Sequence, residues 1–388
     1  MDSQIFAFMC KTRVVHGPGC ASLVGEEVAR LGIPRVLLVT DRGVRKAGLL
    51  EPVEKSLAAS GVAWEVFDRV EEDADVETMH LGALQVREGG CGAVVVVGGG
   101  SPICAGKGIA LEAANGRKVR ELEGRNQYRE PPLPVVCVPT TAGSGSDVSA
   151  AFVVHDAEQQ RVYAVGGDHI QPTATNLDPL LLRSCPPRQM VYSGLDALTH
   201  AVEALWTNKG TSLTDAIAYE AIRLIVGNLK RAAFTDDLEA KNRQHLASAM
   251  ANMACGNASL GLVHGMTMYY SLKLAHGYQN GVLLPYVMEF NLPACEEKLA
   301  RMAVLLGEPA RHKRPRELAG AALRHLKELY LDLGFPRKFD QAEFPAAEIP
   351  QMVETALGNG FHQDNIRKST TEDLAGIYAA SLKGWELG

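Results

Sequence analysis

The sequence predicts an α/β protein with two domains: an N-terminal domain built on a doubly wound parallel sheet and an all-helical C-terminal domain. Three observations support this fold class. The chain has 388 residues, which exceeds what one hydrophobic core usually serves. Its first half alternates short β-branched runs with amphipathic segments. From about residue 186 onward, the strand pattern almost disappears.

The first half contains apolar runs of strand length without polar alternation. They lie at residues 35–40, 63–68, 92–101 and 133–141. Helical patterns separate them, at residues 48–61 and 76–90. Apolar strands that alternate with helices indicate a parallel sheet covered on both faces.

The second half contains long helical patterns, including residues 212–234 and 314–334. We expect helix caps at Ser212 and Thr371, each of which precedes acidic residues. Pro186 and Pro187 can open a helix but cannot continue one. We therefore place the domain boundary there, with an α/β domain over residues 1–185 and a helical domain over 186–388.

The composition excludes several classes of protein. The 39 Lys and Arg residues against 45 Asp and Glu give a mildly acidic chain without a basic run, so we expect no nucleic-acid partner. No stretch resembles a secretion signal or reaches about 18 uninterrupted apolar residues, so we expect no membrane span. The eight cysteines form no Cys-x-x-Cys pair, which favours reduced thiols and a cytoplasmic location.

A glycine-rich turn follows the strand at residues 92–101. The glycines Gly98, Gly99 and Gly100 let a ligand approach the backbone, and Ser101 opens a helix whose N–H groups suit a phosphate. A pyrophosphate would fit this place. The alternative is a tight turn without a ligand, because the stretch lacks the G-x-G-x-x-G spacing of the general dinucleotide fingerprint.

Two further features strengthen the nucleotide interpretation. The segment "VPTTAGSGSDVS" (138–149) follows another buried strand with hydroxyls and small residues, and open α/β sheets bind ligands at the carboxyl ends of their strands. Asp41 ends the strand at 35–40, where its carboxylate could accept from a ribose hydroxyl and repel a 2′-phosphate. That would favour NAD over NADP, although NADP stays possible because Asp41 is equally suited to cap a helix.

Four residues form a candidate metal site. Asp196 and His200 are four residues apart in a helical pattern, so they share one face. His264 and His276 are twelve residues apart, about 120° around one unbroken helix, so a break is needed before they converge. One carboxylate and three imidazoles suit Fe(II) or Zn(II) rather than Mg(II). The alternatives are a surface hydrogen bond for the first pair and satisfied core histidines for the second.

The segments "GGGSPICAGK", "PTTAGSGSDVS", "GLDALTHAVEA" and "HGMTMYYSLKLAHGYQNGVLLPYVMEFN" resemble, in order, the signatures of the iron-containing (group III) alcohol dehydrogenases. The resemblance covers most of the chain. It implies a nucleotide domain, a helical domain and a metal held by Asp196, His200, His264 and His276. It also implies that the dinucleotide contacts Asp41, Gly98, Gly99, Gly100, Ser101, Thr140, Thr141 and Ser144.

The chain departs from this family's pattern at four places. Cys104 stands where an aspartate usually faces the nicotinamide end of the cofactor. Met268 stands where a second histidine is usual, four residues after His264. The stretch between the two ligand histidines is two residues shorter than usual, and Asn-Ile-Arg at 365–367 replaces Asn-Pro-Arg. The first two departures affect the proton relay and the substrate.

The resemblance implies reversible hydride transfer between a nicotinamide cofactor and a small primary alcohol or its aldehyde. Met268 would then line the substrate pocket. Protons would pass through water, a ribose hydroxyl or another residue, for which His362 is the candidate; the alternative for His362 is an ordinary surface histidine in a loop. The resemblance also suggests a homo-oligomer, a dimer or larger. A second hypothesis is a metal-dependent lyase or cyclase of the dehydroquinate synthase type, with NAD as a transient oxidant. A third is a relative that has lost turnover. The sequence names neither the alcohol nor the metal.

Overall fold

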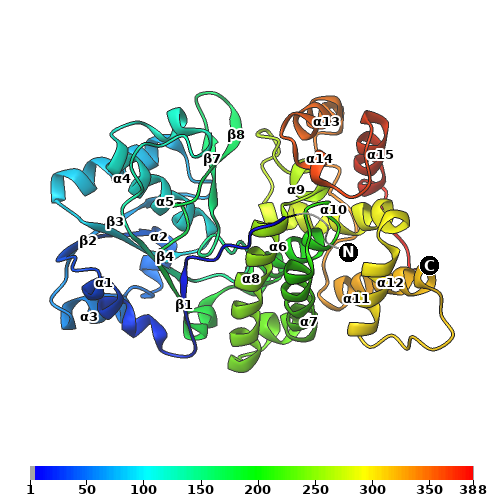
Figure 1. Ribbon diagram of the computed structural model, residues 1–388, viewed down its shortest axis with the longest axis horizontal. Coiled ribbons are helices and arrows are strands. Elements are labelled where there is room, and N and C mark those ends of the chain that lie inside the picture. The colour runs from blue at the N-terminus through cyan, green and yellow to red at the C-terminus, as the bar shows by residue number, and fades with distance from the viewer. Residues whose placement is uncertain (1–4, 388) are drawn as a thin grey trace. The chain divides into compact units, whose positions relative to one another are not determined.

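The computed structural model describes residues 5–387 (Figure 1). These residues form two compact units. The α/β unit consists of residues 9–186 and 236–249, and the helical unit consists of residues 5–8, 187–235 and 250–387. Among the described residues, no helix is both long enough and apolar enough to cross a membrane.

A six-stranded parallel sheet forms the centre of the α/β unit, with strand order β1-β9-β6-β4-β2-β3. Together with the helical unit, this sheet confirms the predicted fold class. Its strands are β1 (Arg13–His16), β2 (Arg35–Asp41), β3 (Ala63–Val70), β4 (Ala93–Gly98), β6 (Val135–Pro139) and β9 (Ala174–Leu177).

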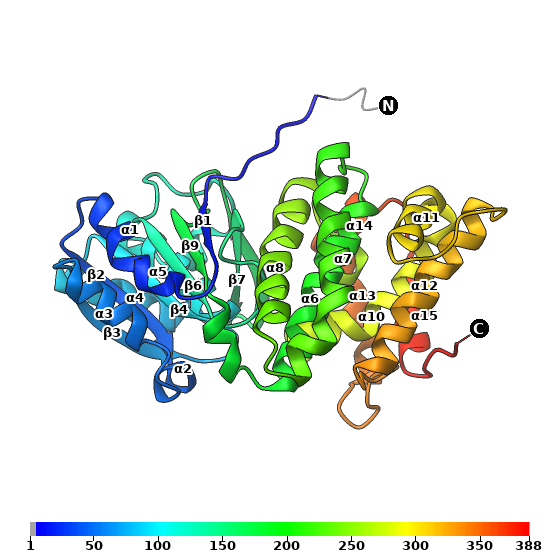
Figure 2. The same cartoon turned by 90° about the horizontal axis from the view of Figure 1, so that it is seen from below.

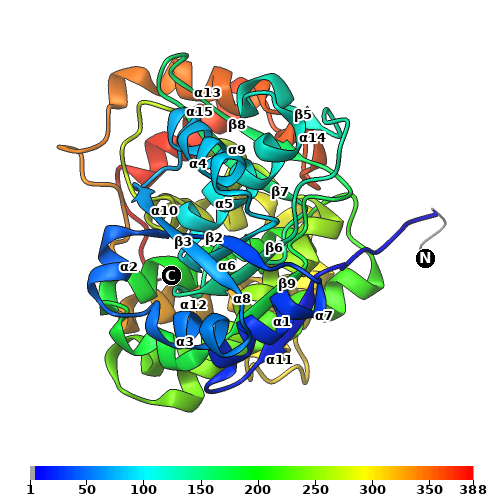
Figure 3. The ribbon, with the colours of Figure 1, turned by 90° about the vertical axis from the view of Figure 1, so that its left-hand side faces the viewer.

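Helices cover both faces of this sheet, as the continuous apolar runs require. Helices α1 (Val24–Arg30) and α3 (Glu51–Ala59) pack on one face with Val36 and Leu38, and α4 (Val76–Gly89) and α5 (Gly100–Asn115) pack on the other with Leu37 and Val39. Figure 3 shows the two pairs on opposite sides of the strands. The short helix α2 (Arg42–Lys46) follows β2.

A second, three-stranded sheet lies in the same unit, with the order β5-β8-β7. Its strands are β5 (Gly124–Arg125), β7 (Ala151–Asp156) and β8 (Arg161–Gly166), of which β7 and β8 form an antiparallel hairpin. Inward and outward residues alternate along β7, where Phe152 and Val154 are buried. This half-buried pattern differs from the continuous apolar runs that predict the parallel strands.

The helical unit contains α6 (Pro187–Leu205) and α7 (Ser212–Phe234), which pack side by side (Figure 2). Helix α8 (Leu238–Ala258) contributes residues to both units. The remaining helices are α9 (Leu262–Met266), α10 (His276–Asn291), α11 (Glu296–Leu305), α12 (Pro315–Asp332), α13 (Ile349–Gly358), α14 (Phe361–Asp364) and α15 (Thr371–Ser381).

Two predicted helix caps are wrong by one residue. Thr211, not Ser212, caps α7, because its side chain accepts from the N–H of Thr214. Thr370, not Thr371, caps α15, because its hydroxyl accepts from the N–H of Asp373. In both places two hydroxyl residues are adjacent, and the cap is the one whose backbone stays extended.

Candidate metal and nucleotide sites

Helix α6 directs three polar side chains to one face. Asp196, His200 and Glu203 follow at intervals of four and three residues, which stacks them on successive turns. All three are buried, with Glu203 completely inaccessible. Buried ionisable groups need partners, because unpaired charge is costly away from water. These partners come from α9 and α10.

His264 lies on α9 and His276 begins α10. Residues 267–275 separate the two helices and contain no regular helix. This confirms the predicted break in the helix between His264 and His276, which the two imidazoles need in order to converge. Packing brings the Nε2 atom of His264 to 3.6 Å from Oδ1 of Asp196 and that of His276 to 3.7 Å from the same oxygen.

These spacings suit a metal ion. Two ligands of a tetrahedral ion lie about 3.4 Å apart when each metal–ligand bond is about 2.1 Å. One ligand atom each from Asp196, His264 and His276 lies within 4.8 Å of the others. His200 is outside this group of three, but its ring stacks on that of His264 with centroids 4.5 Å apart. The residues present therefore fit a divalent cation, with His200 beside the other three.

The charges of the cluster favour a cation. Burial acts to raise the pKa of Asp196, but His200, His264 and His276 outweigh it and lower the value. Burial acts to lower the pKa of His264, but the carboxylates of Asp196 and Glu203 outweigh it and raise the value to about 9. Two buried carboxylates thus stabilise positive charge at the place where the imidazoles meet.

Asn280, one turn after His276 on α10, adds a buried amide to the cluster. Its Nδ2 donates to Oδ1 of Asp196 over 2.7 Å and lies 3.1 Å from Nε2 of His264. Its Oδ1 accepts from the Thr267 hydroxyl. The sequence analysis did not single out Glu203 or Asn280. In the sequence, only spacing could have indicated these two residues, because each lies on the same helical face as a candidate ligand.

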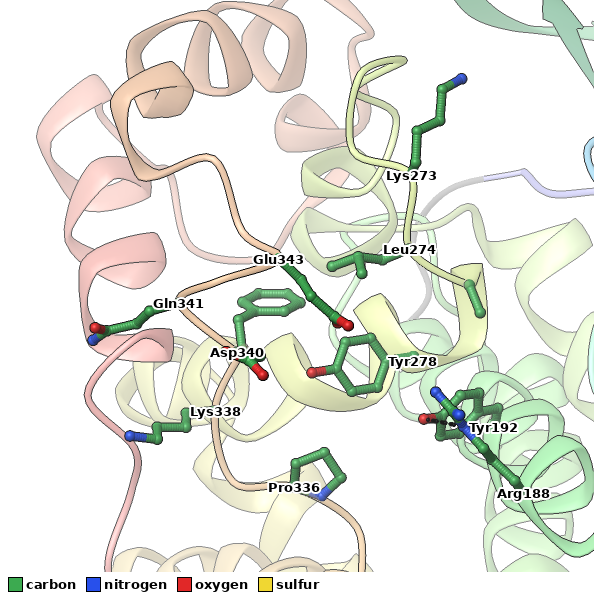
Figure 4. A pocket seen from close by; sticks show the side chains of 12 residues that line it. Arg188, Tyr192, Lys273, Leu274, Tyr278, Pro336, Lys338, Asp340, Gln341 and Glu343 are labelled. Carbon is green, nitrogen blue, oxygen red and sulfur yellow. Dashed lines mark hydrogen bonds between the residues drawn. The ribbon is translucent and has the colours of Figure 1, made fainter.

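A cavity of about 790 Å³ lies beside the start of α10 (Figure 4). Arg188 and Tyr192 reach it from α6 and Tyr278 reaches it from α10, and Arg188 donates to the Tyr192 hydroxyl over 2.8 Å. The lining also carries both cations and carboxylates, at Lys273, Lys338, Asp340 and Glu343. Its charge therefore does not select one class of ligand.

Gly277 allows α10 to approach α6 closely. A Cβ atom at this position would lie 2.3 Å from the carbonyl oxygen of Tyr192. We expect Gly277→Ala to push the helices apart, displace His276, weaken metal binding and lower the free energy of unfolding by about 1–3 kcal/mol. Urea denaturation and a metal titration measure both effects.

Gly320→Ala on α12 is the matched control, because a Cβ there meets no atom within 4 Å. It should leave metal binding unchanged and stabilise the protein by about 0.5–1 kcal/mol. Equal metal affinity in the Gly277 and Gly320 variants would contradict the role of this contact.

The candidate nucleotide residues lie at the carboxyl ends of adjacent strands. Asp41 ends β2, Gly98 ends β4, and Gly99 caps α5. Thr140 donates its N–H to the carbonyl of Gly98. Cβ atoms at Gly99 and Gly100 would lie 3.2 Å from Thr141 and Ser144, respectively. The glycine turn and the hydroxyl loop therefore adjoin. Asp41 ends the neighbouring strand β2, and the winding of the sheet reverses between β2 and β4.

Both interpretations of Asp41 have geometric support. Its Oδ1 accepts from the N–H of Val44 over 2.8 Å, so the side chain caps α2. The cap uses one of two carboxylate oxygens, and the side chain is only half-buried. The residue can therefore cap the helix and still face a ribose.

The residues that depart from the family's usual pattern, together with His362, have the following positions in the structure. Cys104 is half-buried on α5, with Sγ 3.8 Å from the Ser146 hydroxyl oxygen. Met268 is half-buried just after α9. His362 lies on α14, which packs against α9. Ile366 donates its N–H to the carbonyl of Trp206 over 2.8 Å, a hydrogen bond that a proline could not make.

Two family descriptions match successive parts of the chain. Residues 11–179 match "Iron-containing alcohol dehydrogenase", and residues 190–382 match "Fe-containing alcohol dehydrogenase family, C-terminal". This chain belongs to the iron-containing alcohol dehydrogenase family. It is accordingly an oxidoreductase that acts on the CH–OH group of an alcohol with a nicotinamide cofactor.

Individual relatives agree with the family over nearly the whole chain. The 1,3-propanediol dehydrogenase of Klebsiella pneumoniae is 34% identical over 383 residues, covering 97% of this chain and 99% of its own. The NAD-dependent methanol dehydrogenase of Bacillus methanolicus is 33% identical, covering 95% and 97%. A crystal structure of a 1,3-propanediol oxidoreductase superposes with a TM-score of 0.94 at 34% identity, covering 97% and 99%.

Proposed function

We propose that this chain interconverts a small primary alcohol and its aldehyde by hydride transfer with NAD, using a metal held by Asp196, His200, His264 and His276. The observation that carries the proposal is the cluster in which the buried Asp196 and His264 converge with the exposed His276 at spacings suited to one cation. Relatives named for 1,3-propanediol, methanol and lactaldehyde support a short substrate.

The metal would supply Lewis acidity toward the substrate oxygen, worth several kcal/mol. The protein residues would hold the metal in position. Asp196 contributes negative charge, and the imidazoles contribute neutral nitrogen ligands, a set that suits Fe(II) and Zn(II) alike. We propose Fe(II) for this chain, because the matching family is described as iron-containing. The metal content of the purified protein tests this choice.

We propose that the glycine turn Gly98–Ser101, with Cys104 beyond it, and the hydroxyls of Thr140, Thr141 and Ser144 bind the dinucleotide. The N-terminus of α5 then faces the pyrophosphate, because free N–H groups and the helix dipole favour an anion there. Cys104 replaces a carboxylate near the nicotinamide with a neutral group whose Sγ lies near Ser146.

Asp41 sets the preference for NAD in this proposal. Its carboxylate accepts from a ribose hydroxyl and repels a 2′-phosphate. We expect the wild-type protein to prefer NADH, and Asp41→Ser to reduce the ratio of kcat/KM for NADH over NADPH by about tenfold, or about 1.4 kcal/mol. Serine keeps a helix-capping oxygen, so stability should hold. A strong preference of the wild type for NADPH would contradict this role.

His362 is our candidate for proton transfer, and Met268 makes the substrate pocket less polar where a histidine is usual. The His362 side chain is half-buried, and its Nδ1 has no hydrogen-bond partner within the described residues. General acid–base catalysis contributes about 10²–10⁴-fold, so we expect His362→Gln to lower kcat by about a hundredfold. The pH profile of kcat should also lose its histidine limb, and an unchanged profile would exclude the relay.

One assay separates the candidate reactions. Metal-reconstituted protein is mixed with NADH and a panel of short aldehydes, and absorbance of NADH is followed. The proposed activity predicts net NADH oxidation. A lyase or cyclase of the dehydroquinate synthase type would leave NADH unchanged, and a relative without turnover would bind metal without reacting. The geometry favours neither alternative.

We further propose that the chain works as a homo-oligomer, a dimer or larger, in the cytoplasm. Strand β1 lies at one edge of the six-stranded sheet, and an edge strand is a ready template for pairing with another chain. The eight cysteines are free thiols, as in a reducing compartment. Light scattering of the purified protein tests the oligomer.

A further inference from the structure

Glu203 is a buried carboxylate that the reaction itself does not require. It lies on α6, three residues after His200, and its side chain is completely inaccessible. A charge in this position is expensive unless several donors satisfy it. The donors come from α9, the short helix that carries His264.

Each oxygen of Glu203 has a separate partner on α9. Oε1 accepts from the N–H of Val263 over 2.7 Å. Oε2 accepts from Nδ1 of His264 over 2.7 Å and lies 3.4 Å from the N–H of the same residue. One carboxylate therefore satisfies the open end of α9 and one nitrogen of the imidazole.

Helix α9 depends on such contacts because it has only five residues, too few to be stable by itself. Its N-cap residue, Gly261, has no side chain to cap it, and a Cβ there would lie 3.0 Å from Oε1 of Glu203. At the other end, the hydroxyl of Tyr378 donates to the carbonyl of Met266 over 2.5 Å. Glu203 and Tyr378 thus hold opposite ends of α9, but only Glu203 touches the imidazole.

We propose that Glu203 is the positioning residue of the metal site: it holds the proton of His264 on Nδ1 and turns Nε2 toward Asp196 and His276. This inference rests on the metal site of the proposed function. A histidine that binds metal through one nitrogen usually donates its other N–H to a carboxylate, which fixes the ring and its tautomer. Glu203 meets this requirement, and Nε2 of His264 lies 3.6 Å from Oδ1 of Asp196.

Glutamine at position 203 cannot replace both contacts. Glutamine offers one acceptor oxygen and one donor NH₂. If the oxygen faces the imidazole, the NH₂ group opposes the N–H of Val263. If the oxygen faces Val263, the NH₂ group favours the wrong tautomer of His264. Glu203→Gln therefore keeps the size of the side chain and removes its positioning function.

The test is a titration of metal-free protein with Co²⁺ alone, followed by visible absorption. We expect Glu203→Gln to bind Co²⁺ about 10–100-fold more weakly than the wild type. Tyr378→Phe is the matched control, because it releases the other end of α9 without touching His264; we expect its affinity within about threefold of the wild type. Equal losses in the two variants, or no loss in Glu203→Gln, would overturn the proposal.

A second measurement needs no substitution at Glu203. In wild-type protein loaded with Zn²⁺ and labelled with ¹⁵N-histidine, His264 should carry its proton on Nδ1 and bind Zn²⁺ through Nε2. Metal bound through Nδ1 would overturn the proposal even if Glu203→Gln does not fold. A wild-type protein that binds neither Co²⁺ nor Zn²⁺ would overturn the metal site and this inference together. A normal wild-type site with an indifferent Glu203 would overturn only the inference.

Discussion

His264→Ala is expected to lose its bound metal and about a thousandfold in kcat/KM for aldehyde reduction. The imidazole supplies one of the three converging ligand atoms and is buried between two carboxylates. Its removal takes one partner from each carboxylate, so that Asp196 keeps Asn280 and Glu203 keeps the N–H of Val263. A Lewis-acid contribution of about 4 kcal/mol corresponds to about three factors of ten in rate. Elemental analysis and initial rates with NADH measure the two effects on the same sample.

His325→Ala provides the control. His325 lies on α12 and pairs with Glu308, with Nε2 3.1 Å from the carboxylate. Like His264, it is an imidazole paired with a carboxylate. Its partners among the described residues are Glu308 and Glu328, neither of which is a candidate ligand. The control should keep both metal and activity. Full activity of His264→Ala without bound metal would refute the metal-dependent mechanism.

Lys107→Met is expected to lower the free energy of unfolding by about 3–5 kcal/mol. The ammonium group is fully buried on α5, and it donates to the carbonyls of Ser149 and Ala151 over 2.8 and 3.1 Å. Burial lowers the pKa of Lys107, and the nearby charge of Asp147 opposes this shift. Methionine keeps the unbranched shape of the side chain, one atom shorter, but removes the donor to both carbonyls. Urea denaturation monitored by circular dichroism measures the loss.

The partner substitution tests whether the charges are coupled. Asp147 is also buried, and burial raises its pKa. Combining Asp147→Asn with Lys107→Met removes both charges, so the double variant should lose less stability than the two single losses added together, by about 0.5–3 kcal/mol. Strict additivity would contradict the coupling. The single Lys107 variant should also bind NADH more weakly, because residues 140–149 lose an anchor.

The parallel sheet could be predicted because its strands are buried on both sides. Strands β2, β4 and β6 are continuous apolar runs in the sequence. The hairpin of β7 and β8 was not predicted, because only every second residue of β7 is buried. The cap of α7 was misplaced because Thr211 and Ser212 carry the same functional group. Backbone conformation, which the sequence leaves open there, decides between them.

The candidate ligands could be selected from spacing, but their supporting residues could not. Helical periodicity places Asp196 and His200 on one face. His264 and His276 are candidates because both lie in an otherwise apolar stretch of the sequence. The role of Glu203 can be recognised only once α9 is placed against α6, because its hydrogen-bond partners lie about sixty residues later in the chain. The role of Asn280 likewise depends on its hydrogen bond to Asp196, which lies 84 residues earlier in the chain.

Helix α8 constrains how the protein can be divided. Residues 236–249 belong with residues 9–186, and within that unit the Gln244 side chain donates to the carbonyl of Ala142 in the hydroxyl loop. An excised fragment that stops at Pro186 would lack this segment of α8. A stand-alone α/β unit would instead need a linker from Pro186 to Asp236 that bypasses both α6 and α7. Domain exchange between relatives by a single crossover would likewise separate the hydroxyl loop from the helix that supports it.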